Sequence, residues 1–385
     1  MKILLLHNYF SYLGGEDLYH DSLKKLLEAN DNKVIEFTKN SREIIKKTIL
    51  AKFLVAKRLY WSKSIGSELS KTILREKPQI AHFNNIFPLI TPLAYRICGK
   101  LGLPIVQTVH DYRYICPGAQ LFKDGRMCDL CLGKDRFYFS LFYGCYHHSR
   151  LASFFFATSL LFHKVINSFR YINKFIFPSD FSRSIFLKNS DMPKEKTITI
   201  PYFVKADSKK AEKKDYFLFV GRFSEEKGII NLLEMFSKMP NLKLVVIGDG
   251  PLNKKVHRYK NYKNILIQKF LPRFEVFRYM RSAKATIIPS LFYETGPMVL
   301  LESFANNTPV IVPKFGSFKE AVQDGQTGLF YKQYDFDDLK TKIVYASKNT
   351  LLMRKMGIAA RKEYEIKYTP KRHYETLMEI YRSLI

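Results

Sequence analysis

Residues 289–305 read PSLFYETGPMVLLESFA, a run that sets two acidic residues, Glu294 and Glu302, eight positions apart. Proline is tolerated in the first turn of a helix, so we expect a helix to begin near Pro297. Glu294 would then lie in the loop before this helix, and Glu302 more than one turn inside it. Glu302 has apolar neighbours in the sequence, whereas an acid pair on a solvated face would have polar ones.

The N-terminus of such a helix exposes unpaired backbone N–H groups and a partial positive charge, which together favour a phosphate. Each flanking carboxylate can accept hydrogen bonds from paired hydroxyl groups. A ligand with a diphosphate between two polyols would meet all of these groups, and a nucleotide-sugar is such a ligand. The residues expected to line its phosphates are Gly296, Pro297, Met298 and Val299.

The chain is strongly basic. Its 385 residues carry 63 Lys and Arg against 35 Asp and Glu, a formal net charge of +28. The length allows two or three domains, and a hydrophobic content of 46% supports full cores and argues against disorder. A charge excess of this size implies an anionic partner: a nucleic acid, a membrane surface or a phosphorylated substrate.

Basic residues concentrate in residues 39–77, which hold eleven Lys and Arg against three Glu. Apolar and aromatic side chains lie among them: Phe53, Leu54, Tyr60 and Trp61. This mixture suits an anionic membrane leaflet, where a well-placed cation contributes about 1 kcal/mol. The alternative is a dispersed, solvated basic surface.

No segment of the sequence is typical of a signal peptide or a membrane span. The N-terminus turns polar too soon for a signal peptide. The longest apolar stretch, Leu151 to Phe162, falls short of the about 20 residues that a span needs. We therefore expect a cytoplasmic protein that attaches peripherally to the inner face of the plasma membrane.

Four of the five cysteines cluster with the spacing C-x11-C-x2-C-x13-C: Cys116, Cys128, Cys131 and Cys145. In a reducing cytosol such thiols favour a metal over disulfides. The C-x2-C unit with two further cysteines fits a structural tetrahedral zinc site. The alternatives are ordinary buried thiols, or disulfides in another compartment. Cys98 lies in an apolar helical pattern and is expected in the core.

Strand and helix patterns alternate twice along the chain, which predicts α/β architecture with parallel sheets covered on both faces. Residues 1–203 form the first Rossmann-like half, with a Cys-rich insert at 116–145. A Lys-rich stretch from Val204 to Asp215 has the composition of a linker, and residues 204–370 form the second half. Two such halves would face each other across a crevice that receives the carboxyl ends of their strands.

Several candidate residues follow predicted strands, where open α/β sheets bind ligands. Gly14 and Gly15 end the first loop between a strand and a helix, where glycine lets the backbone approach a phosphate closely. Arg222 and Lys227 would neutralise a leaving diphosphate. Gly248 ends the next predicted strand, in a turn that would shape the nucleotide pocket.

His110 follows the strand predicted at Pro104–Val109. A histidine at a strand end can donate a hydrogen bond to a sugar or take part in proton transfer, although a lone histidine is more often structural.

Together these features resemble the family-4 retaining glycosyltransferases of GT-B fold, over nearly the whole chain. The segments that carry the resemblance are Tyr293-Glu294-Thr295-Gly296-Pro297 with Glu302, Val220-Gly221-Arg222 with Glu226-Lys227-Gly228, Gly14-Gly15-Glu16, Val246–Pro251 and Asp324–Leu329. The resemblance implies that Glu302 holds the ribose and that Glu294 lies at the donor sugar. It implies that Arg222 and Lys227 contact the diphosphate and that His110 lies near the reacting sugar.

The same resemblance implies a catalytic cycle without a metal, and a final helix, residues 371–385, that returns to the N-terminal domain. The Cys-bearing segment resembles an insert found in a subset of these enzymes. Two positions depart from the pattern: Asn84, where relatives often have His, and Ser317, where a second glycine is common.

We therefore expect a retaining hexosyltransferase that moves a sugar from a nucleotide-sugar to an acceptor. The basic surface favours a lipid-linked saccharide acceptor, as in surface polysaccharide assembly. A nucleotide-sugar 2-epimerase of the same fold is one alternative. A basic nucleic-acid-binding protein is the other, although no RNA- or DNA-binding motif is present, so no nucleic-acid partner is expected.

Overall fold

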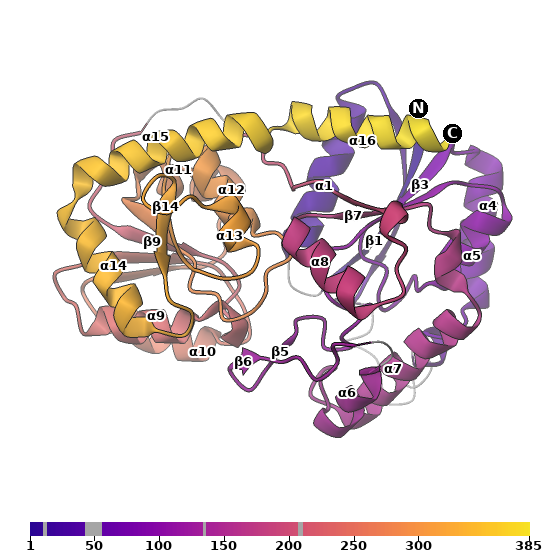
Figure 1. The fold of residues 1–385 in the computed structure, drawn as a ribbon, viewed down its shortest axis with the longest axis horizontal. Coiled ribbons are helices and arrows are strands. Elements are labelled where there is room, and N and C mark those ends of the chain that lie inside the picture. Colours follow the sequence, from indigo (N-terminus) through magenta and orange to yellow (C-terminus); the bar gives the residue numbers. More distant parts are fainter. Residues whose placement is uncertain (11–13, 43–55, 134–135, 207–210) are drawn as a thin grey trace. The chain divides into compact units, whose positions relative to one another are not determined.

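The computed structural model describes residues 1–10, 14–42, 56–133, 136–206 and 211–385. By their contacts these residues form two units. The first unit consists of Met1–Leu121, Cys128–Ile200 and Tyr374–Ile385, and the second of Phe122–Met127 and Pro201–His373. Each unit contains one six-stranded parallel sheet (Figure 1).

The sheet of the first unit has the order β2-β1-β3-β4-β7-β8. Its strands are β1 (Lys2–Tyr9), β2 (Lys33–Asn40), β3 (Ile80–Phe83), β4 (Ile105–Thr108), β7 (Lys174–Phe177) and β8 (Thr197–Thr199). The helices of this unit are α1 (Gly15–Glu28), α4 (Lys63–Glu76), α5 (Leu93–Lys100), α6 (Phe139–Tyr143), α7 (Arg150–Val165), α8 (Asp180–Asn189) and most of α16 (Pro370–Leu384). Because β2 and β3 pair with opposite sides of β1, the strand order reverses there, and a ligand crevice is expected at the carboxyl end of β1.

The sheet of the second unit has the order β11-β10-β9-β12-β13-β14, the arrangement of a dinucleotide-binding Rossmann fold. Its strands are β9 (Phe217–Val220), β10 (Leu244–Ile247), β11 (Ile265–Gln268), β12 (Ala285–Ile287), β13 (Val310–Pro313) and β14 (Gly328–Tyr331). Its helices are α9 (Ile229–Ser237), α10 (Asn253–Val256), α11 (Arg273–Ser282), α12 (Met298–Ala305), α13 (Phe318–Ala321), α14 (Phe336–Lys348) and α15 (Thr350–Lys367). The order reverses between β9 and β12.

The central strands are continuous apolar runs because helices cover both faces of each sheet. In the second unit, β9 and β10 read FLFV and LVVI and are almost wholly buried. They pack against the apolar side of α9, which contributes Leu232, Leu233 and Phe236 to the same core. The α/β class and the two Rossmann-like halves predicted from the sequence are confirmed.

A small hairpin from the Cys-rich segment groups with the second unit. It consists of β5 (Phe122–Lys123) and β6 (Arg126–Met127), which pair antiparallel. The backbone N–H of Met127 donates to the hydroxyl of Tyr334, 2.8 Å away, and that hydroxyl donates to the carbonyl of Leu291 at 2.9 Å. The hairpin is thereby tied to the loop that follows β12.

None of the helices in the described ranges is both long enough and apolar enough to cross a bilayer. Of the basic segment 39–77, residues 43–55, with Phe53 and Leu54, lie outside the described residues.

Candidate functional site

Two loops meet where the strand order of the second unit reverses. The first, Gly221–Gly228, follows β9, and the second begins at Ile288 after β12. The loops touch so closely that a Cβ at Gly228 would lie 2.1 Å from the carbonyl oxygen of Pro289. Gly228 also has a φ of +66°, which favours glycine. A hydrogen bond from the Leu291 N–H to the Glu226 carbonyl, 2.8 Å long, joins the loops again.

These loops bring Lys227 and Glu294 together. The Lys227 ammonium donates to Glu294 Oε1 at 2.7 Å, and the hydroxyl of Ser290 donates to the same oxygen at 2.5 Å. The ammonium also lies 4.9 Å from the centre of the Phe292 ring. The hydroxyl of Ser317 donates to the Glu294 carbonyl at 2.7 Å. Ser317, a departure from the family pattern, thus fixes the backbone of the acidic residue.

Arg222 forms the second cation–carboxylate pair of the site. Its guanidinium lies 2.9 Å from Glu226 Oε1, which also accepts a hydrogen bond from the Ser224 hydroxyl at 2.6 Å. Burial by itself would raise the pKa of Glu226, but Arg222, Ser224 and Lys227 outweigh it, and the pKa is lowered. Glu226 is therefore a fixed anion that orients the Arg222 guanidinium, whose side chain remains 38% exposed.

Glu302 lies in the second turn of α12 and is 6% exposed. Its carboxylate is 3.1 Å from the guanidinium of Arg273, the first residue of α11. Burial raises the pKa of Glu302, and Arg273 opposes that rise. Sequence reasoning missed Arg273, although its place directly after Pro272 is a signal for the start of a helix.

The remaining residues predicted to bind the nucleotide surround these pairs in the chain. Met298 and Val299 are the first two residues of α12, directly after Pro297 and Gly296. Helix N–H groups at such positions lack a carbonyl partner within their own helix. Gly248 follows β10 and has a packing reason to be glycine, because a Cβ there would lie 1.9 Å from the Gly221 carbonyl oxygen.

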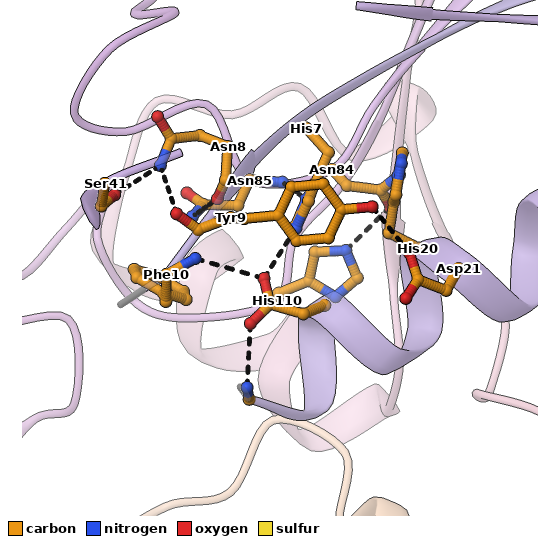
Figure 2. A network of polar contacts seen from close by, with 12 residues as sticks. His7, Asn8, Tyr9, Phe10, His20, Asp21, Ser41, Asn84, Asn85 and His110 are labelled. Carbon is orange, nitrogen blue, oxygen red and sulfur yellow. Dashed lines mark hydrogen bonds and ion pairs between the residues drawn. The ribbon is translucent and has the colours of Figure 1, made fainter. Parts of the chain in front are cut away.

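In the first unit, His110 follows β4 and belongs to a buried polar network (Figure 2). Its Nε2 lies 2.9 Å from Asn84 Oδ1, and the Asn84 amide nitrogen lies 3.1 Å from His20 Nδ1. A carbonyl oxygen only accepts, so His110 Nε2 carries the proton. Burial, and next the nearby His7, lower the pKa of His110 well below its usual value. His110 is therefore neutral, and Asn84 links it to His20.

Asp17 connects this network to the glycine loop. Its carboxylate accepts from His7 Nε2 at 2.8 Å and from the Gly14 N–H at 2.9 Å. Gly14 is the N-cap of α1, and Gly15 is its first helical residue. Residues 11–13 lie outside the described ranges, and sequence reasoning missed both His7 and Asp17.

The four clustered cysteines are reduced, with Cys116 and Cys131 joined by an Sγ–Sγ hydrogen bond. This bond, opposed by burial, lowers the pKa of Cys116 to about 7. The same bond, together with burial and the nearby sulfurs of Cys145 and Cys128, raises the pKa of Cys131. Within the described residues, no three His, Cys, Asp or Glu side chains are arranged to hold a metal ion as they stand. Zinc binding therefore stays a prediction.

Comparison with known proteins agrees with the architecture. The family of glycosyl transferases group 1 matches residues 203–363, and glycosyltransferase family 4 matches residues 21–208. An uncharacterised glycosyltransferase of Methanocaldococcus jannaschii is 26% identical over 100% of this chain and 99% of its own length. The alpha-monoglucosyldiacylglycerol synthase of Acholeplasma laidlawii is 32% identical over 30% of this chain and 31% of its own length.

Among solved structures, Anabaena HepE in complex with UDP-glucose covers 100% of both chains with a TM-score of 0.68 and 16% identity. This likeness shows the fold. The two family profiles together extend from residue 21 to residue 363. One relative that matches over nearly its full length is a glycosyltransferase, and the two-sheet architecture is shared. The chain therefore belongs to the family-4 glycosyltransferases of GT-B fold.

Proposed function

We propose that this glycosyltransferase is a retaining hexosyltransferase that uses a nucleoside diphosphate sugar, and that the reversal point of the second sheet is its donor site. The observation that carries the proposal is the pair of cations on the loop after β9: Arg222 is held by Glu226, and Lys227 is held by Glu294, four residues before α12 begins. A uridine nucleotide is the first donor to test, because the similar HepE structure contains UDP-glucose.

Each of these cations already pairs with a carboxylate. A bound diphosphate would take the place of that carboxylate as the partner of the cation. Arg222 and Lys227 would bind the diphosphate oxygens and stabilise the charge that grows on the leaving phosphate. The Lys227–Glu294 contact would give way, and the freed carboxylate would accept hydrogen bonds from the donor sugar. Glu302 would accept a hydrogen bond from the ribose while one of its oxygens stays on Arg273.

Retention requires that the acceptor attack the face of the sugar from which the phosphate leaves. We propose that the leaving phosphate assists this attack, because no carboxylate of the site is assigned as a nucleophile. His110, neutral with its proton on Nε2, would act near the sugar as a hydrogen-bonding group. Gly14 and Gly15, at the N-terminus of α1, would let the backbone approach a phosphate closely.

The acceptor is proposed to be a lipid-linked saccharide at an anionic inner leaflet. The charge of +28 supports this, and some relatives bear names of lipid-directed enzymes, including the diacylglycerol glycolipid synthase above and a lipopolysaccharide N-acetylglucosaminetransferase of Salmonella typhimurium. We also propose that Cys116, Cys128, Cys131 and Cys145 close around a structural zinc ion, with support from their C-x11-C-x2-C-x13-C spacing.

The decisive experiment is a product assay with nucleotide-sugars and a lipid extract as the source of acceptor. We expect sugar transfer with retained anomeric configuration, and thermal stabilisation by UDP of about 2.7 kcal/mol at 100 times its Kd. Release of a 2-epimer in the absence of acceptor would instead assign the epimerase reaction. Products with inverted configuration would refute the retaining mechanism.

A further inference from the structure

Helix α7 carries an apolar face that is largely exposed. Leu151, Phe154, Leu161 and Val165 are 62%, 47%, 45% and 71% exposed. At 100° per residue these four side chains fall within an arc of about 80°. The opposite side of the helix is buried in the first unit through Phe156, Leu160 and His163. The exposed stripe is therefore a continuous second face, which we call the α7 face.

The neighbours of α7 extend this surface. Helix α6 packs against α7, as Figure 1 shows, and exposes Phe142 at 66% and Tyr143 at 49%. Thr158 falls within the same arc of α7, and its hydroxyl is 2.6 Å from that of Tyr60. The neighbouring Trp61 is 49% exposed, so this segment adds an aromatic side chain to the surface. Contiguous exposed apolar surface of this extent usually marks an interaction site.

The charge around the α7 face identifies the kind of partner. No Asp or Glu occurs between Arg136 and Ser179, and none occurs in residues 56–67. Four exposed cations lie on α7 or on the segment that contacts it: Lys57, Arg58, Lys63 and Arg150. Apart from Asp191, which pairs with Lys164 of α7 at 2.9 Å, the charges beside the stripe are positive. An apolar stripe flanked mainly by cations and by Trp and Tyr is the composition of a helix that lies in the interface of an anionic bilayer.

The length of α7 fixes its orientation at such a surface. Its 16 residues extend about 24 Å, less than the about 30 Å of the hydrocarbon core, so the helix lies in the plane of the membrane. We propose that the α7 face inserts among the headgroups of an anionic bilayer and that the cations beside it bind lipid phosphates. The proposal rests on the proposed peripheral attachment and assigns it to a surface that the sequence reading, centred on residues 39–77, did not identify.

Vesicle co-sedimentation of the full chain tests the proposal. The probes are vesicles of phosphatidylcholine alone and of phosphatidylcholine with phosphatidylglycerol. The test variant combines Leu151→Gln, Phe154→Gln, Leu161→Gln and Val165→Gln, which changes no charge. Its matched control combines Leu351→Gln, Ile358→Gln and Ile366→Gln on α15, where the side chains are 75%, 55% and 63% exposed.

We expect the α7 variant to bind anionic vesicles at least tenfold more weakly than wild type, because its four glutamines no longer transfer apolar surface from water into the bilayer. The α15 control should bind like wild type. Circular dichroism and UDP binding should be unchanged in both variants. The variant Lys57→Gln/Arg58→Gln should weaken binding to anionic vesicles and reduce its dependence on salt.

Wild-type binding by the α7 variant would overturn the proposal, and so would equal losses in the α15 control. A wild-type dimer in sedimentation velocity that the α7 variant converts to a monomer would assign the face to a second copy of the chain. If vesicle binding follows the expectation while UDP binding and sugar transfer are absent from wild type, the proposed function fails and the membrane surface stands.

Discussion

Replacement of Glu302 by Ala should weaken the binding of a nucleoside diphosphate roughly 10- to 150-fold. A hydrogen bond to a charged group contributes about 1.5–3 kcal/mol, and each 1.4 kcal/mol corresponds to a factor of ten in Kd. One oxygen of Glu302 already faces Arg273, so the expectation counts a single net ribose bond. Glu302→Gln should bind with intermediate affinity, because an amide keeps one acceptor but adds donors.

The same substitution should also destabilise the second unit, since it leaves the Arg273 guanidinium without its carboxylate. Loss of one partner of a fully buried ion pair costs about 3–5 kcal/mol. The Arg273 side chain is 30% exposed, so water compensates in part and we expect about 1–3 kcal/mol. Stability and affinity must therefore be measured separately, by thermal unfolding and by calorimetry with UDP alone.

The control is Arg273→Met, which removes the cation and keeps the carboxylate. It should unfold at a lower temperature than wild type but retain nucleotide binding within about threefold, because no ribose bond is lost. Calorimetry should be done at pH 8, because burial raises the pKa of Glu302 and a higher pH favours its carboxylate. If Glu302→Ala binds UDP as tightly as wild type, Glu302 does not hold the ribose, and the assigned orientation of the donor is wrong.

Three further predictions concern the remaining groups. Arg222→Ala and Lys227→Ala should each slow turnover by about 10²–10³. The control Lys238→Ala, which changes an exposed ion pair, should leave turnover unchanged. Wild-type turnover in the first two variants would show that these residues do not bind the diphosphate. Protein purified without chelator should contain one zinc ion per chain, and X-ray absorption should give Zn–S distances near ~2.3 Å. The variant Cys128→Ser/Cys131→Ser should lose the zinc. If wild type contains no metal, the cysteines are structural thiols. Burial lowers the pKa of His20 to about 2 and that of His163 to about 4, so both stay neutral when folded and protonate on unfolding. Their contribution to stability is present above the ordinary pKa of about 6.5 and falls as the pH drops, so the unfolding temperature should decline from pH 7 to 5, and less so in His163→Gln; a flat profile would contradict this.

The sequence predicted the architecture well because both sheets are built from short apolar runs separated by turn residues. The helix expected to begin near Pro297 starts at Met298, and the strand expected at Pro104–Val109 is Ile105–Thr108. Helix α11 was missed, since its sequence RFEVFRYMRS is charged and buries only one side. That omission is why Arg273, the partner of Glu302, was not foreseen.

Motif reasoning identified side chains but not their partners. Lys227 and Glu294 were assigned to different parts of the ligand, and they are 67 positions apart in the chain, yet the fold places their charged atoms 2.7 Å from each other. Such a contact depends on the register of two loops, which periodicity does not encode. The departure at Asn84 likewise became interpretable only when its amide was found to bond both His110 and His20.

The discontinuity of the two units has a consequence for synthesis and for engineering. The first unit includes Tyr374–Ile385, and the hydroxyl of Tyr381 hydrogen-bonds to His82 on β3. On the ribosome this unit therefore remains incomplete until the second has been translated. A chimera joined at residue 203 would separate α16 from its sheet and would leave the β5–β6 hairpin without Tyr334, so exchange of donor specificity requires junctions at all four crossings of the chain.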